Sequence, residues 1–563
     1  MLVFQDIWVA ILLAHTTIIL NTIHCQRVEC NPRVVQEDEN KIVCVCNETY
    51  CDSLGPITLP EKGSFIIYTS NRKGQRLKKI VKSFVHGKRR LSQYHSASPY
   101  KIKITVDTSK TRQTVLGFGG MFSWRLNGAF TDAAGINIAS LSEPLQKQLL
   151  SSYFGPDGIG YSIGRIPIGG TDFSTRPYTY DDNNLRVDMN LSAFSLQKED
   201  FEYKIPFVKL AQNLEPTLLL YGSPWTAPPW MKTNKAYTGR GMLQKQYFKV
   251  WANYIVKFLQ EYEKQGVRMW GLTTQNEPID GLIPFFPFNS MGWTSSMQKD
   301  WVKNYFGPIL HENGYQDVKV MILDDNTILL PYWAKDVLSD PDASMFVSGI
   351  GVHWYTRQLS GYEGVRKTLD LFPDKFILAT EACAGFLKWQ DNVDLGSWER
   401  GEEYGEDIIQ ELNHGASGWT DWNIALNKLG GPNWVNMGAD SPIIVDSEDM
   451  EFYKQPMFYI LAHFSKFFTR NSEIISNQIS ANNSNLISSL ISGLSGFDAQ
   501  LNPDFAKNIF AVAALRSDNA VVVGILNKNE FPVLVDLVDS NGGRGTAVFN
   551  ISEKSMSTIL FMS

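Results

Sequence analysis

The stretch "KFILATEA" (residues 375–382) is a short apolar run that ends on a glutamate, Glu381. Its length and composition are those of a strand buried on both faces. Between about residue 110 and residue 422, seven further runs of this kind alternate with longer helical patterns. They are TVLGFGG (114–120), GYSIGRIPIGG (160–170), TLLLYGSPW (217–225), MWGLTTQNEP (269–278), VKVMILDDN (318–326), SGIGVHWY (348–355) and ASGWTDWN (416–423). The sequence therefore predicts an α/β fold, a (β/α)₈ TIM barrel whose site lies at the carboxyl ends of the strands.

Two of the intervening segments have a clear helical period. Residues 246–262 repeat large apolar side chains at steps of three and four, and residues 142–154 do the same after Ser142, a suitable N-cap. An open doubly wound sheet is the alternative fold. That fold favours a glycine-rich phosphate turn, and "GFGGMFS" (117–123) is a poor match to one.

The segments outside the barrel alternate like antiparallel strands. Residues 58–105 and 470–563 both show this pattern, so we expect one accessory β-sandwich domain built from the two chain ends. The catalytic barrel is then 106–423 plus 453–469, and a small β module comprises 26–57 plus 424–452.

The first residues have the character of a targeting segment. "IWVAILLAHTTIIL" (7–20) is too short to span a bilayer and suits the core of a signal peptide covering residues 1–25. Four N-glycosylation sequons agree with a secretory route, and they begin at Asn47, Asn190, Asn482 and Asn550. A formal net charge of −6 argues against a nucleic-acid partner.

Five of the six cysteines lie near the amino terminus. If Cys25 leaves with the signal peptide, Cys30, Cys44, Cys46 and Cys51 remain, and three disulfide pairings are possible. A zinc site is the alternative, but Cys44 and Cys46 lack the usual spacing of a zinc knuckle. The sixth cysteine, Cys383, fits a buried structural thiol better than a nucleophile. We predict neither a metal site nor a cofactor.

A second glutamate matches Glu381. Glu277 ends the fourth predicted strand in "TTQNEP", and the ends of the fourth and seventh strands face each other across a barrel mouth. Two carboxyl groups facing across a cleft suit glycoside hydrolysis, one donating a proton to the leaving oxygen and one attacking the anomeric carbon. Arg165, at the end of the second strand, is a plausible cation that keeps Glu381 ionised. For either glutamate alone, a salt bridge or a helix cap is the simpler explanation.

Beyond this pair, motifs along nearly all of the presumed mature chain resemble the glucocerebrosidase (glucosylceramidase) family of retaining glycoside hydrolases. They include VCVCNETYCDS, GIGYSIGRIP, SPWTAPPWMKTN, TQNEP, VHWY, TEACAG, GWTDWN, GGPNWV and FYKQPMFY. The resemblance implies that Glu277 is the acid/base and Glu381 the nucleophile. It also implies that Asn276 binds the sugar 2-hydroxyl and that Tyr355 orients the nucleophile. The remaining substrate-binding residues that it implies are Asp132, Trp225, Trp422, Asn433, Phe288 and His353.

The resemblance further implies a lysosomal enzyme that hydrolyses glucosylceramide at an anionic phospholipid surface with a saposin-type activator. Nine lysines and arginines in residues 72–90 suggest membrane docking, although a solvated hairpin is the simpler explanation. Two alternatives stay open: a secreted β-glycanase, such as a xylanase or glucanase, and an impaired sugar- or lipid-binding paralogue. The second arises because "MFSWRLNG" (121–128) is inserted just before Asp132, where the family runs straight on.

Overall fold

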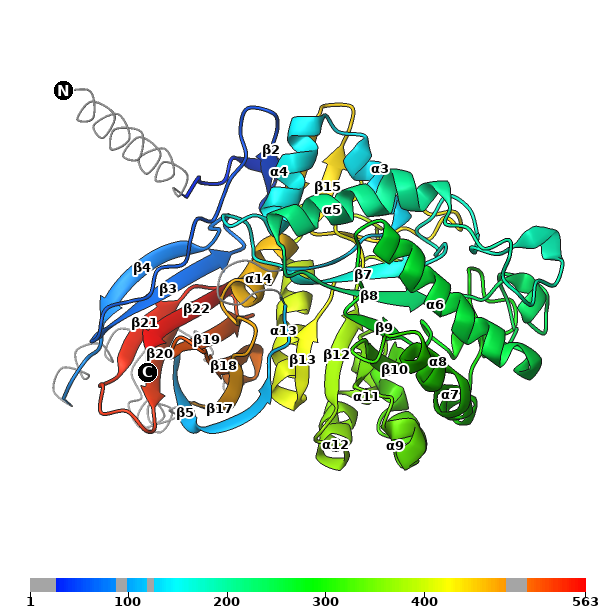
Figure 1. The fold of residues 1–563 in the computed structure, drawn as a ribbon. Coiled ribbons are helices and arrows are strands. Elements are labelled where there is room, and N and C mark those ends of the chain that lie inside the picture. Colours follow the sequence, from blue (N-terminus) through cyan, green and yellow to red (C-terminus); the bar gives the residue numbers. More distant parts are fainter. Residues whose placement is uncertain (1–26, 88–98, 119–125, 482–503) are drawn as a thin grey trace, which may run out of the picture.

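The computed structural model describes residues 27–87, 99–118, 126–481 and 504–563, and Figure 1 shows three sheets. The central sheet has eight parallel strands in the order β13-β12-β11-β10-β9-β8-β7-β6. They are β6 (Leu126–Ala129), β7 (Ser162–Ile168), β8 (Leu219–Pro224), β9 (Gly271–Thr273), β10 (Lys319–Asn326), β11 (Gly349–His353), β12 (Phe376–Glu381) and β13 (Ala416–Trp419). Helices pack around these strands, as predicted for a (β/α)₈ barrel.

The barrel strands form because their side chains are apolar on both faces. Every residue of β7 is buried, and so is every residue of β11. Ile163, Tyr221, Met321 and Leu378, from four different strands, pack together in one buried cluster. The larger core fills the space between the strands and the helices.

The helices around the barrel cover this core with amphipathic faces. They are α3 (Asp132–Ala139), α4 (Glu143–Phe154), α5 (Ile205–Leu214), α6 (Phe248–Lys264), α7 (Ser295–Trp301), α8 (Gly307–Glu312), α9 (Tyr332–Leu338), α10 (Pro341–Ser344), α11 (Arg357–Ser360), α12 (Glu363–Leu371), α13 (Trp398–His414) and α14 (Pro456–Ser465). Both helices that we expected from their period are present: α4 follows Ser142, and α6 covers most of 246–262.

The first barrel strand differs from the prediction. We expected it at residues 114–120, but Thr114 ends β5 of another sheet, and Gly117 makes only an isolated parallel bridge to Gly418 of β13. The strand that pairs with β7 is β6, which includes the last three residues of the 121–128 insert. The rest of the insert lies outside the described residues. The first position of the barrel is therefore shared between two separate pieces of chain.

The two chain ends combine into one nine-stranded sheet with its own apolar core. Its order is β21-β20-β5-β17-β18-β19-β22-β3-β4. These strands are β3 (Ser64–Asn71), β4 (Lys78–Ser83), β5 (Lys101–Thr114), β17 (Glu473–Ala481), β18 (Ile509–Leu515), β19 (Ala520–Asn527), β20 (Val533–Asp539), β21 (Ala547–Ile551) and β22 (Ser555–Met562). Because β5 continues past the predicted domain boundary at residue 105, one strand links this sheet directly to the start of the barrel.

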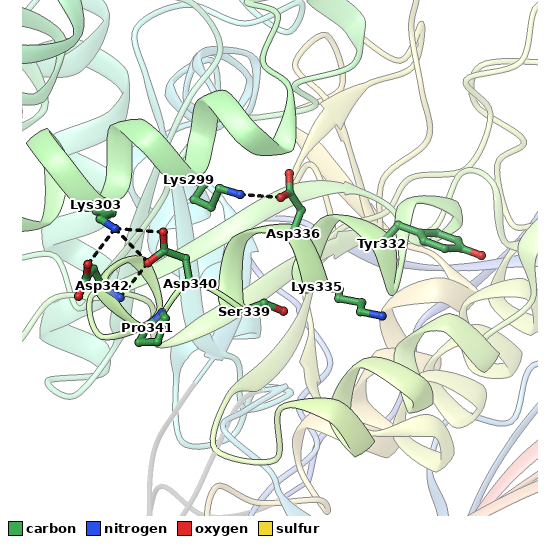
Figure 2. Close-up of a pocket in the computed structure, with 9 residues that line it drawn as sticks. All are labelled: Lys299, Lys303, Tyr332, Lys335, Asp336, Ser339, Asp340, Pro341 and Asp342. Atoms are coloured by element: carbon green, nitrogen blue, oxygen red, sulfur yellow. Dashed lines mark hydrogen bonds and ion pairs between the residues drawn. The ribbon is translucent and has the colours of Figure 1, made fainter.

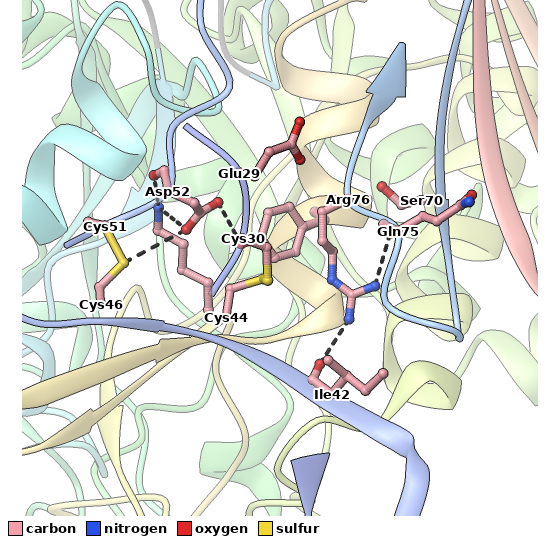
Figure 3. Close-up of a disulfide and its surroundings, with 12 residues drawn as sticks. Glu29, Cys30, Ile42, Cys44, Cys46, Cys51, Asp52, Ser70, Gln75 and Arg76 are labelled. Atoms are coloured by element: carbon pink, nitrogen blue, oxygen red, sulfur yellow. Dashed lines mark hydrogen bonds and ion pairs between the residues drawn. A yellow bond between two sulfur atoms is a disulfide. The ribbon is translucent and has the colours of Figure 1, made fainter. Parts of the chain in front are cut away.

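The small module is a five-stranded sheet with the order β1-β2-β16-β15-β14. Its strands are β1 (Pro32–Val35), β2 (Asp38–Cys46), β14 (Leu426–Asn427), β15 (Ile443–Asp446) and β16 (Glu451–Lys454). Two disulfides, Cys30–Cys44 and Cys46–Cys51, secure its amino-terminal part, which decides among the pairings that the sequence left open. Figure 3 shows Asp52 beside the second disulfide; its carboxylate pairs with Lys454 at 3.0 Å.

Several other sequence predictions concern single residues. Cys383 is a buried free thiol. Of the sequons, Asn190 and Asn550 are exposed and Asn47 is half-buried. Asn482 and the predicted signal peptide lie outside the described residues. Within the described ranges, no helix is long and apolar enough to cross a membrane.

Candidate active site

Glu277 and Glu381 lie together at the carboxyl ends of the barrel strands. Glu277 follows β9 and Glu381 ends β12. One oxygen of each carboxylate and one ring nitrogen of His353 all lie within 4.8 Å of one another. Both glutamates line a cavity of about 330 Å³. The two strand-end carboxylates therefore share one site.

An unusual backbone conformation directs Glu277 into this site. Its φ is +39°, in the left-handed region that side chains larger than glycine rarely adopt. Its N–H donates to the carbonyl of Asp324 at 2.9 Å, and its carbonyl accepts from the N–H of Asp280 at 3.0 Å. Strained backbone of this kind concentrates at functional sites because the surroundings fix it.

Both carboxylate oxygens of Glu381 are hydrogen-bonded. Oε1 accepts a 2.7 Å bond from the Tyr355 hydroxyl, and Oε2 pairs with the guanidinium of Arg165. Arg165 is completely buried and also donates to Asn276 Oδ1 at 2.7 Å. The predicted cation beside Glu381 is thus present. Its bonds orient this carboxylate and stabilise its charged form.

Asp324 connects Arg165, His353 and Thr380 through hydrogen bonds, and no sequence pattern singles it out. A register shift between β10 and β11 follows Leu323, and Asp324 itself has a φ of +58°. Its carboxylate accepts from Arg165 at 2.9 Å and from Thr380 at 2.6 Å, and it lies 3.1 Å from His353 Nε2. Although burial raises the pKa of Asp324, the charge of Arg165 and the hydrogen bond of His353 bring it well below its ordinary value.

His353 lies between two carboxylates. Its Nδ1 is 3.1 Å from Glu277 Oε1, and its Nε2 faces Asp324. Burial lowers its pKa, but the charge of Glu381 and the bonds to Asp324 and Glu277 raise it more, to about 10. The imidazole is therefore a cation in the working range of the site, and it donates to both carboxylates.

The two glutamates respond differently to this setting. Burial raises the pKa of each. At Glu277 the hydrogen bond and charge of His353, with Asp280 and Arg165, outweigh burial and bring the pKa below its ordinary value. At Glu381 burial and the charge of Glu277 prevail over His353 and Arg165, so the pKa is raised. The groups titrate as one coupled set.

Aromatic side chains form the wall and floor of the cavity. The rings of Trp225 and Trp422 stack at 4.9 Å, and Arg165 lies 4.8 Å from the Trp225 ring centroid. Phe288 and Phe286 also line the cavity, and their rings meet edge-on at 4.5 Å. Aromatic faces of this kind cover the C–H face of a sugar ring, so the placement of these predicted residues suits a carbohydrate ligand.

Two predicted asparagines lie just outside the cavity lining. The Oδ1 of Asn276 accepts from Arg165. Asn433 donates through Nδ2 to Asp172 Oδ2 at 3.3 Å and to the carbonyl of Met437 at 2.9 Å. Both therefore contact residues of the site.

Asp132 lies outside the cavity lining. Asp132 is the first residue of α3, and its carboxylate accepts from Ser174 at 2.6 Å and from Tyr178 at 3.0 Å. It also pairs at 3.4 Å with the buried Lys204. These partners hold the side chain in the protein interior, 3% exposed.

Asp172 lines the cavity instead, and the sequence analysis missed it. It follows β7 in "RIPIGGTDFS", at a strand end like both glutamates, so the same reasoning could have found it. Burial and the charges of Glu381 and Glu277 raise its pKa to about 8.

Among the residues that the structure describes, two groups of side chains are close enough together to hold a metal ion. One consists of Cys46, Cys51 and Asp52, but both of its sulfurs belong to a disulfide. The other consists of Glu277, His353 and Glu381. In the second group the charges of Arg165 and of His353 itself already oppose the carboxylates, which disfavours an additional cation.

A larger hollow, of about 780 Å³, lies on the outer helices α7, α9 and α10 (Figure 2). Its charged side chains pair with one another: Lys299 with Asp336 at 2.7 Å, and Lys303 with Asp342 at 2.8 Å. All three carboxylates that line it, those of Asp336, Asp340 and Asp342, are paired with lysines.

Two carboxylates this close, in an aromatic-walled cavity at the strand ends of a barrel, define a glycosidase. Residues 124–468 match the model of the glycosyl hydrolase family 30 TIM-barrel domain, and the chain belongs to this family.

Curated relatives agree with this assignment over most of their length. The chain is 42% identical to the lysosomal acid glucosylceramidase of Mus musculus, over 90% of each chain. It is 39% identical to putative glucosylceramidase 3 of Caenorhabditis elegans, over 95% of each. Among solved structures, SrfJ from Salmonella typhimurium superposes with a TM-score of 0.74 at 25% identity, covering 89% of this chain and all of SrfJ.

Proposed function

We propose that this glycosidase is a retaining β-glucosidase that hydrolyses glucosylceramide to glucose and ceramide by double displacement. One observation carries the stereochemical part: a carboxylate oxygen of Glu277 lies within 4.8 Å of one of Glu381. Retaining enzymes hold the two carboxyl groups about 5–5.5 Å apart, whereas inverting enzymes need a wider gap for a water molecule. The substrate part is supported by the similarity to glucosylceramidases.

In this mechanism Glu381 is the nucleophile. Its two oxygens are held by Tyr355 and Arg165, which orient the carboxylate toward the anomeric carbon and favour its ionised form. Attack breaks the glycosidic bond and forms a glycosyl ester on Glu381. Glu277 gives a proton to the leaving oxygen and later takes one from the water that cleaves the ester.

The glucose unit is proposed to bind against Trp225 and Trp422. Asp172 offers oxygens to sugar hydroxyls, and Asn433 positions Asp172 through the 3.3 Å hydrogen bond. Since Arg165 engages Oδ1 of Asn276, the amide nitrogen of Asn276 is the donor that we assign to the 2-hydroxyl.

The rim of the cavity supports a lipid substrate. Phe285 is 96% exposed beside Phe286, and Trp389 is 80% exposed in the loop after Phe386; both Phe286 and Phe386 line the cavity. Leu429, 81% exposed, lies on a loop that touches the Trp389 loop through a 3.5 Å contact from Asn392. Exposed aromatic and aliphatic side chains gathered around a cavity suit contact with a bilayer. We propose that this rim meets the membrane that contains the substrate.

The basic stretch at 72–90 supports membrane docking only in part. Arg72 pairs with Glu530, Lys73 pairs with Glu553, and Arg76 is buried. Lys78, Lys79 and Lys82 lie on the exposed strand β4, and residues 88–90 are outside the described ranges. A lysosomal location completes the proposal, by similarity to the lysosomal acid glucosylceramidase. An anionic phospholipid surface and a saposin-type activator are proposed as partners from the resemblance of the sequence motifs alone.

The 121–128 insert does not argue for an impaired paralogue. The doubt that it raised concerned Asp132, which does not line the cavity. Glu277, Glu381, Tyr355 and His353 keep their mutual bonds.

The decisive experiment is hydrolysis of glucosylceramide in anionic vesicles at a pH of about 5, with xylan and β-1,6-glucan as competing substrates. Glu277→Gln and Glu381→Gln should each abolish glucose release. Activity on a glucan and none on the lipid would make the chain a glycanase. Binding without turnover by the unaltered chain would make it a sugar-binding paralogue.

A further inference from the structure

A third carboxyl group contacts the acid/base directly. Asp280 begins the short 3-10 turn η5 (Asp280–Leu282), three residues after Glu277, and lines the same cavity. The side chains of Glu277 and Asp280 are hydrogen-bonded to each other. Two carboxyl groups can share a hydrogen bond only when one of them carries a proton.

The local backbone builds this pair. The left-handed φ of Glu277 turns the chain so that the N–H of Asp280 donates to the carbonyl of Glu277 at 3.0 Å. The N–H of Ile279 donates to Asp325 Oδ2 at 3.2 Å, which fixes the turn against β10. Asp280 is therefore held beside Glu277 on a supported turn.

The charges around the pair decide where the proton lies. The charged groups that act on the pair are Asp325 from β10, His353 from β11, Glu381 from β12 and Arg165 from β7. His353 and Arg165 stabilise a negative charge on Glu277. Burial and the charges of Glu277, Asp325 and Glu381 raise the pKa of Asp280 to about 11. These charges favour the proton of the pair on Asp280.

We propose that Asp280 stores the proton that the acid/base delivers, and that this proton reaches Glu277 through their hydrogen bond when substrate binds. Glu277 then donates it to the leaving oxygen as the glycosidic bond breaks, and both carboxylates are left ionised. In the second half of the reaction, the oxygen of a water molecule attacks the glycosyl ester and displaces the Glu381 carboxylate. The water gives a proton to Glu277 in this step, and the proton returns to Asp280. Asp280 is thus a positioning residue that acts through Glu277. This inference rests on the proposed acid/base role of Glu277.

The test uses leaving groups that differ in their need for a proton. Asp280→Asn keeps the size and a hydrogen-bond donor but cannot release a proton. For an alkyl β-glucoside, kcat/KM should fall by about tenfold to a hundredfold, within the range that general acid catalysis supplies. For 2,4-dinitrophenyl β-glucoside, whose leaving group needs no proton, kcat/KM should change by less than about threefold. In a Glu277→Gln background the same substitution should have no further effect.

Controls separate the possible outcomes. Asp342→Asn, which removes an exposed carboxylate on the outer helix α10, should behave like the unaltered enzyme. Asp280→Glu keeps a carboxyl group and should restore part of the alkyl glucoside activity. If Asp280→Asn retains full activity on both substrates, the residue is a fixed hydrogen-bond donor, and the inference is wrong. An equal loss on both substrates would also overturn it, because it would indicate a structural role. If the unaltered chain hydrolyses neither substrate, the proposed function fails first.

Discussion

The hydroxyl of Tyr355, in the loop after β11, donates a 2.7 Å hydrogen bond to Glu381 Oε1 at the end of the neighbouring strand β12. The same hydroxyl lies 3.4 Å from the buried thiol of Cys383. Tyr355 therefore fixes one oxygen of the proposed nucleophile from the side opposite to Arg165.

Tyr355→Phe should weaken catalysis without unfolding the protein. A hydrogen bond to a charged group contributes about 1.5–3 kcal/mol, so kcat/KM for an aryl β-glucoside should fall by roughly tenfold to a hundredfold. The pKa of Glu381 should rise, moving the acidic limb of the pH–rate profile upward. An unchanged profile would mean that the bond does not act on the nucleophile.

Replacing Asp132 should lower the stability of the protein, whereas replacing Asp172 should lower its activity. Asp132→Asn weakens the buried pairing with Lys204, which retains Asp200 at 3.0 Å, so we expect a loss of about 1–3 kcal/mol in unfolding free energy. Its KM should stay unchanged. Asp172→Asn should leave the thermal midpoint nearly unaltered but lower kcat/KM by about threefold to tenfold, because a hydrogen bond to sugar is lost. If Asp132→Asn instead raises KM, the assignment of the two residues is reversed.

The folded protein should be more stable in acid than at neutral pH. Burial, together with charges from Glu381 and Glu277, raises the pKa of Asp172 from 3.8 to about 8; burial and the charge of Asp188 raise that of Asp181 to about 7. At a pH between 3.8, the pKa of an unfolded aspartate, and these raised pKa values, the folded chain holds protons that the unfolded chain has released. Stability then falls as pH rises, because the folded state binds more protons.

Denaturant unfolding at a pH of about 5 and of about 7.5 measures this difference. The unfolding free energy should be lower at the higher pH, and the difference should shrink in Asp172→Asn. An unfolding free energy that increases with pH would contradict the assigned protonation states.

The exposed rim should matter only for membrane-embedded substrate. Replacing both Phe285 and Trp389 by serine should lower activity on glucosylceramide vesicles at least fivefold, since each aromatic contributes about 1 kcal/mol or more of apolar burial. Turnover of a soluble glucoside should stay within twofold. Tyr332→Ser, at a site 79% exposed on the outer helix α9, is the matched control and should change neither. Equal losses on both substrates would place the two residues in the sugar site instead.

Features that depend on strand ends could be predicted from the sequence. Glu277 and Glu381 end apolar runs, and parallel strands bring such ends to one rim, so the pair followed from pattern alone. The disulfides were expected, but their pairing depends on how β1 and β2 align, which periodicity does not give. Asp324 joins the site through a register shift, and Asp280 through a left-handed turn at Glu277. Such conformations depend on tertiary contacts and leave no repeating signal in the sequence.

The first barrel strand was misplaced for a related reason. The run at 114–120 is apolar, but pairing of Thr114 with Glu473 extends β5 into it. A single aspartate after a barrel strand, such as Asp132, can either face the cavity or begin a helix. Sequence pattern does not distinguish these two orientations.

The pairing of distant strands has a consequence for biosynthesis. Strand β2 pairs with β16, and β3 pairs with β22 at the extreme carboxyl end. Until those late residues leave the ribosome, the strands at the front of the chain have open edges, which are ready templates for aggregation. The local Cys46–Cys51 bridge can close early, and the five-stranded sheet needs only the strands up to β16. The nine-stranded sheet must wait for β22, so in a nascent chain of this topology the edges of β3 and β5 stay exposed to aggregation for longest.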